Sequence, residues 1–64
     1  MNNRAYKRAV QLIPGSSALH RALAIAYTQA GQFEDAVSEY KLYLALAPDA
    51  KDADQVRKII DSTE

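Results

Sequence analysis

The chain has 64 residues, of which eight are Lys or Arg, eight are Asp or Glu, and 48% are apolar. A chain of this length forms one domain at most, and it buries only about 60% of the surface that its unfolded form exposes. It has no cysteine, which excludes disulfides and thiolate metal sites. Its formal charge of zero removes the usual electrostatic basis for binding nucleic acid. No uncharged stretch suits a membrane span, and the first residues lack the apolar run of a signal peptide. We therefore expect a soluble module that binds neither nucleic acid nor a membrane, in a compartment that the sequence leaves open.

Three breaks divide the chain into four expected helices. The first break is the Pro-Gly-Ser-Ser segment at residues 14–17, in which Ser16 and Ser17 are good N-caps. The second is Gly31, which suits the left-handed residue that ends a helix. The third is the Pro-Asp pair at residues 48–49, and Asp52 then starts a new helix with capping-box spacing to Gln55. Because no stretch alternates with a period of two residues, the sequence predicts an all-α fold.

Each expected helix has an apolar stripe at helical spacing. The first stripe consists of Tyr6, Ala9, Val10 and Ile13. The second helix is apolar over most of its circumference, so we expect it to pack on two sides. The last helix has the narrow stripe Ala53, Val56, Ile59 and Ile60. Its other side is polar, which predicts one solvent-exposed face. On that side Asp54 lies four residues before Lys58, which predicts an ion pair.

An internal repeat becomes visible when the chain is shifted by 34 residues. The shift aligns Tyr6 with Tyr40, Lys7 with Lys41, Leu12 with Leu46 and Pro14 with Pro48. A period of this size is typical of helical repeat proteins. Residues 17–50 resemble one complete tetratricopeptide repeat, with the family positions filled by His20, Leu23, Ala24, Tyr27, Ala36, Tyr40 and Pro48, and with Gly31 at the turn. His20 departs from the bulky aromatic residue that the family prefers there.

The resemblance implies an α-solenoid of antiparallel helical hairpins, with four helices in a single module. Residues 2–14 resemble the second helix of a preceding, partial repeat, and residues 52–62 resemble the polar capping helix that closes such arrays. Pro48 would end the second helix of the complete repeat. Tyr43 stands where the family favours Ala, so its ring should make the last helix dock differently from a true next repeat.

The residues that could carry chemistry have structural interpretations that we favour. His20, the single histidine, could be a metal ligand or a general base, but without cysteine or a second histidine a partly buried ring is the better interpretation. Ser16 and Ser17 could be nucleophiles, but N-capping accounts for them better. We therefore expect no enzyme activity, no catalytic or metal site, and no cofactor.

Two charged clusters leave similar alternatives. The acidic cluster Asp49, Asp52 and Asp54 could bind calcium, but it lacks the spacing and closing Glu of an EF-hand, and solvated charge near a helix start is favoured. The basic cluster Arg4, Lys7 and Arg8 could attract an acidic or phosphate-bearing partner, but an ordinary solvated face is favoured.

The resemblance implies a protein-interaction function. In this family the first helix of each repeat lines the concave face that binds peptides or partner helices, and here that face would present Ala18, Arg21, Ile25, Thr28 and Gln29. Arg21 suits a clamp for a peptide carboxylate, but Ile25 replaces the Asn that clamping members have, which argues against such a clamp. The alternative is a structural or self-associating repeat fragment without a ligand. It would form a homo-oligomer through the uncovered face of Tyr6, Ala9, Val10 and Ile13.

Overall fold

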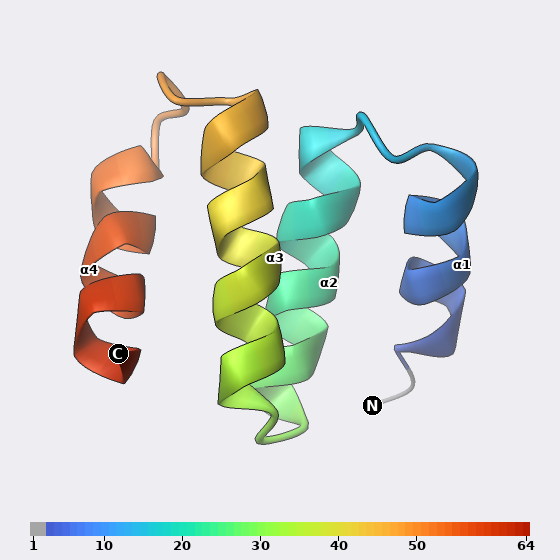
Figure 1. Cartoon of the computed structure of the whole chain (residues 1–64), viewed down its shortest axis with the longest axis horizontal. Coiled ribbons are helices and arrows are strands. Elements are labelled where there is room, and N and C mark those ends of the chain that lie inside the picture. The colour runs from blue at the N-terminus through green and yellow to red at the C-terminus, as the bar shows by residue number, and fades with distance from the viewer. Residues whose placement is uncertain (1–2) are drawn as a thin grey trace.

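The computed structural model describes residues 3–64 and shows four helices in that range. They are α1 (Arg4–Leu12), α2 (Ser17–Gln29), α3 (Phe33–Leu46) and α4 (Ala53–Thr63). The helices lie side by side in chain order, and each runs antiparallel to the one before it (Figure 1). The predicted all-α fold is therefore confirmed, although residue 2 of the expected first helix lies outside the described residues.

Local sequence signals set most of the helix ends. The Ser16 hydroxyl accepts a hydrogen bond from the Leu19 amide at 3.3 Å, so Ser16 is the predicted N-cap of α2. Gly31 has a φ of 77°, the left-handed conformation expected at the turn between α2 and α3. The third helix ends at Leu46, before Pro48, which could not continue its hydrogen bonding.

The expected capping box of α4 is wrong. Asp52 is at the N-cap position, but its side chain makes no capping hydrogen bond. Its carboxylate instead accepts hydrogen bonds from Arg21 and Tyr43, which belong to α2 and α3. These two hydrogen bonds replace the capping bond to the backbone of α4. Asp52 therefore joins helices to one another rather than capping α4.

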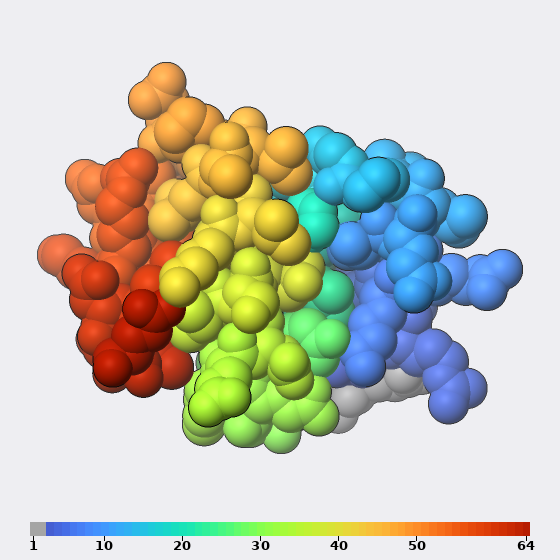
Figure 2. Space-filling model, viewed as in Figure 1, coloured from blue at the N-terminus to red at the C-terminus, as the bar shows by residue number. Residues whose placement is uncertain are grey.

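The core lies between α2, α3 and α4. Its buried members are Ala24, Ala36, Val37, Tyr40, Tyr43, Val56 and Ile60. Burying a side chain such as Val56 or Ile60 contributes about 1.5–3 kcal/mol relative to leaving it exposed. The second helix packs against both α1 and α3, as its broad apolar surface predicts. In the space-filling view the two middle helices lie between α1 at one side and α4 at the other (Figure 2).

The outer helices differ from the expectation in two details. Tyr6, Ala9, Val10 and Ile13 form an apolar stripe on α1 and the residue after it. None of them is buried, because α1 packs against α2 alone and one neighbour covers only part of the stripe. On α4, Ala53, Val56 and Ile60 are buried as expected. The predicted pair between Asp54 and Lys58 is wrong, because the Asp54 carboxylate instead pairs with Arg57 at 2.9 Å.

Candidate protein-binding groove

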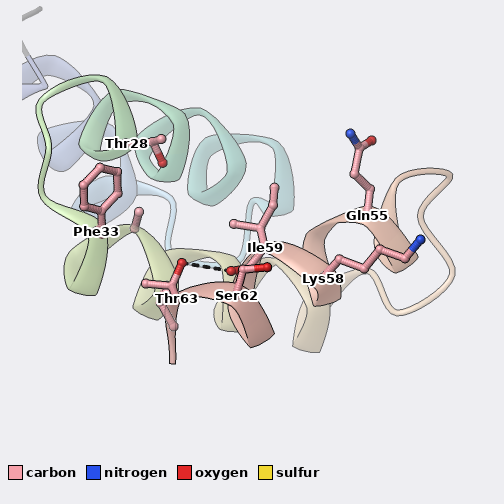
Figure 3. Close-up of a pocket in the computed structure, with 9 residues that line it drawn as sticks. Thr28, Phe33, Gln55, Lys58, Ile59, Ser62 and Thr63 are labelled. Atoms are coloured by element: carbon pink, nitrogen blue, oxygen red, sulfur yellow. Dashed lines mark hydrogen bonds between the residues drawn. The ribbon is translucent and has the colours of Figure 1, made fainter.

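A groove of about 320 Å³ lies on the side of the molecule where α2, α3 and α4 meet. It is lined by Thr28 of α2, by Phe33, Ala36 and Val37 of α3, and by Gln55, Lys58, Ile59, Ser62 and Thr63 of α4. Figure 3 shows Phe33 and Thr28 on one side, with Ile59, Ser62 and Thr63 on the other. Three consecutive helices of the array therefore contribute to one concavity.

The groove has an apolar centre and polar edges. Ala36 and Val37 belong to the core and form a buried wall of the groove. Beside them Phe33 is 54% exposed and Ile59 is 37% exposed, so two large apolar side chains face solvent at the same place. The Thr63 hydroxyl donates to the Ile59 carbonyl at 2.9 Å, so it is satisfied within its own helix. Exposed apolar surface rimmed by polar groups is characteristic of an interaction site.

The α2 residues expected to bind a partner have different surroundings. Ala18 and Gln29 are exposed, and Thr28 lines the groove while its hydroxyl donates to the Ala24 carbonyl at 2.9 Å. Ile25 is half-buried and packs against the core, and Arg21 is tied to Asp52. The structure thus brings one of the five, Thr28, into the groove.

Sequence reasoning missed the contribution of α4. We expected α4 to be a cap with one wet side, and Ile59 to belong to its buried stripe. Ile59 instead lies at the edge of that stripe and faces the groove together with Gln55 and Ser62. The signal was present, because Ile59 follows Gln55 by four residues and precedes Thr63 by four, so all three share one face of the helix.

Arg21, Tyr43 and Asp52 form a polar cluster that joins three segments of the chain. The Arg21 Nε donates to Asp52 Oδ2 at 2.7 Å, and the Tyr43 hydroxyl donates to Asp52 Oδ1. The hydrogen bonds from Tyr43 and from Arg21 lower the pKa of Asp52, against the effect of burial. The bond to the Asp52 carboxylate, together with burial, raises the pKa of Tyr43. Because its charge is matched within the cluster, Arg21 contributes to holding α2 against the start of α4.

The buried-ring interpretation of His20 matches its position, with an exposed fraction of 4%. The carboxylate of Glu39 lies 2.7 Å from the ring Nδ1, and the carbonyl of Pro14 lies 2.7 Å from Nε2. Both ring nitrogens thus have protein partners. Within residues 3–64, no cluster of three or more His, Asp or Glu side chains is arranged to hold a metal ion, and Asp52 and Asp54 pair with arginines instead.

The candidate self-association face lies on α1 and the residue after it. Tyr6 is 38% exposed and Ile13 is 58% exposed, whereas Ala9 and Val10 are half-buried. Leu12, which lies outside the expected stripe, is 71% exposed and extends this face. On the side toward α2, the Lys7 ammonium lies 5.5 Å from the centre of the Tyr27 ring, a cation–π distance. None of the helices in the described part of the chain has the length and hydropathy needed to cross a bilayer.

A profile of the tetratricopeptide repeat family matches residues 3–61. The chain belongs to this family. The match covers all of α1, α2 and α3 and most of α4, so the hairpins described above are tetratricopeptide helices. No curated protein and no solved structure matches the chain. Repeats of this family generally serve as interaction modules without catalytic activity, and they use surfaces built by adjacent helices.

Proposed function

We propose that this tetratricopeptide module binds a peptide or a helix of a partner protein in the groove between α2, α3 and α4. The observation that carries the proposal is the exposure of Phe33 and Ile59 beside the buried wall of Ala36 and Val37. An apolar side chain of the partner would fill this space and bury both residues. Such buried anchors contribute most of the binding energy in protein interfaces.

The polar edge of the groove suits the rest of a peptide. Gln55 can donate and accept hydrogen bonds along a backbone, and Lys58 favours a carboxylate or carbonyl near the anchor. Ala18 and Gln29, exposed on α2, extend the surface along the same helix that contributes Thr28. Function as a binding module therefore needs no chemistry from the protein, and we assign it no enzyme activity and no cofactor.

We further propose that α1 is the second helix of a partial repeat, that residues 17–50 form a complete repeat, and that α4 is a capping helix. A first helix of a further repeat would need apolar residues where α4 has Asp54, Arg57 and Asp61. These three are exposed, and Asp54 and Arg57 pair with each other. A polar outer face of this kind is what ends a repeat array in water.

The binding proposal is tested with an array of labelled peptides that present single apolar residues, followed by fluorescence anisotropy on the peptides that bind. The change Ile59→Asp should weaken binding at least tenfold, about 1.4 kcal/mol, because it places a charge in the apolar centre. Leu42→Asp is the matched control, since Leu42 is 46% exposed on α3 but does not line the groove. Equal losses in the two folded variants, or no bound peptide, would overturn the proposal.

A second candidate function is self-association through α1, favoured by the exposure of Tyr6, Leu12 and Ile13. Light scattering on the wild-type chain would give a dimer mass or higher, and the double change Tyr6→Ser with Ile13→Ser would give a monomer. Leu42→Ser, which alters an equally apolar surface position outside this face, should leave the mass unchanged. A wild-type chain that stays monomeric at high concentration would rule this candidate out.

A further inference from the structure

The buried ring of His20 links three parts of the molecule. It lies on α2, its Nδ1 faces the Glu39 carboxylate of α3, and its Nε2 faces the Pro14 carbonyl in the loop that joins α1 to α2. Each contact is 2.7 Å, and the exposed fractions of the two side chains are 5% for His20 and 16% for Glu39. Little water therefore reaches the contact between the ring and the Glu39 carboxylate.

Both partners of the ring are hydrogen-bond acceptors. A backbone carbonyl accepts only, and an ionised carboxylate also accepts only. A neutral imidazole has a single N–H, so it can donate to one of them and must turn a lone pair toward the other. The two contacts at 2.7 Å are satisfied together by an imidazolium ring, which donates from both nitrogens.

We propose that protonated His20 is a pH-dependent tie that holds the α1–α2 loop, and with it α1, against the α2–α3 hairpin. When the ring loses a proton, the remaining N–H stays with Glu39, because a hydrogen bond to a charged carboxylate is stronger than one to a neutral carbonyl. The bare Nε2 then faces the Pro14 carbonyl, and these two acceptors repel each other. Pro14 follows the end of α1 at Leu12 by two residues, so the loop and α1 are released together.

The weak packing of α1 makes it the element that responds. Not one of its residues is buried, and it packs against α2 alone. Local opening of such an element needs less free energy than global unfolding. Opening would also separate Lys7 from the Tyr27 ring and uncover that face of α2.

The groups around the ring favour the charged form. Burial by itself lowers the pKa of His20, but the hydrogen bonds to Glu39 and Pro14 and the negative charge of Glu39 outweigh it and raise the pKa above the ordinary 6.5. In the described structure Glu39 is the charged side chain bonded to the ring, while Arg21 on α2 is paired with Asp52 and Lys7 on α1 lies over Tyr27. Stability from the tie is therefore complete below pH 6.5 and is lost as the pH rises through the raised pKa.

The test combines two NMR measurements on the full chain. Nitrogen shifts of the His20 ring report how many protons it carries, and hydrogen exchange, corrected for the intrinsic pH dependence, reports opening at the Val10 amide of α1 and the Ala24 amide of α2. The ring should be doubly protonated at pH 5.5. The opening constant at Val10 should rise with the ring titration, by about tenfold for each unit by which the pKa of the ring with α1 closed exceeds its pKa with α1 open. The opening constant at Ala24 should stay constant.

Variants distinguish a pH-dependent role of His20 from a purely structural role. Glu39→Gln removes the charge and should move the midpoint of the Val10 transition to lower pH, whereas Glu34→Gln, an exposed change on the same helix, should not. His20→Phe keeps the ring volume and should abolish the pH dependence of Val10. A ring that is neutral at pH 5.5, or a Val10 opening constant that does not follow the ring titration, would overturn the proposal.

Discussion

The two outer helices pack in similar ways but are held very differently. Each contacts one middle helix, α1 against α2 and α4 against α3. The fourth helix buries Ala53, Val56 and Ile60, and its start is joined to α2 and α3 through Asp52. The first helix buries no residue and has no side-chain cap. The two helices therefore differ in how firmly they are held although each packs against one neighbour. The difference lies in the burial of their side chains and in the contacts at their ends.

The largest effect should come from removing the same apolar side chain at each end. Ile60 on α4 is 8% exposed, so Ile60→Ala should lower the free energy of unfolding by about 3 kcal/mol, because it leaves a cavity in the core. Ile13, just after α1, is 58% exposed, and Ile13→Ala should change that free energy by less than about 0.5 kcal/mol. Urea denaturation followed by circular dichroism measures both. Similar losses would show that the two ends are equally well packed.

A smaller effect should follow from weakening the polar cluster at the start of α4. Asp52→Asn removes the charge that binds Arg21. It should lower the free energy of unfolding by about 1 kcal/mol at pH 6. The pKa of Asp52 is lowered in the folded state, so its contribution is present above the ordinary pKa of an aspartate and disappears as the pH falls through the lowered value. The free energies of unfolding of wild type and variant, measured by urea denaturation, should therefore become equal at acidic pH. Asp54→Asn, at an almost fully exposed side chain, is the control and should be nearly neutral at every pH.

The smallest effect concerns the caps near α1. Ser16→Ala should lower the free energy of unfolding by about 1 kcal/mol or slightly less, because it removes the acceptor for the Leu19 amide. Asn3→Ala should be close to neutral, because Asn3 is at the N-cap of α1 without a side-chain hydrogen bond. Thermal denaturation of the two variants would sharpen the contrast between a capped and an uncapped helix. An equal shift in melting temperature would mean that the Asn3 side chain also stabilises its helix.

The fold was predictable because its signals are local or periodic. Pro14, Gly31 and Pro48 mark where helices stop, and the repeat of 34 residues identifies which segments pair. The tertiary roles of polar residues were not predictable in the same way. Asp52 has good capping chemistry, and only the approach of Arg21 and Tyr43 from other helices draws its carboxylate away.

The groove was only partly predictable for the same reason. The resemblance to the tetratricopeptide family placed Thr28 on a binding face of α2, and Thr28 does line the groove. Whether that face is open depends on how the next helix docks. The stripe of α4 was read as one surface, but α3 covers Val56 and Ile60 and leaves Ile59 beside Phe33. The angle at which α4 meets α3 is a property of the packed core rather than of any local sequence pattern.

The charged outer face of α4 makes the two ends of the module unequal as surfaces for packing a further helix. A helix added before residue 3 could cover Tyr6, Leu12 and Ile13 and gain free energy by removing apolar surface from water. A helix added after residue 64 would have to strip water from Asp54, Arg57 and Asp61, which costs free energy unless each charge finds a partner. An additional helix would therefore pack more favourably against the exposed face of α1 than against the charged face of α4.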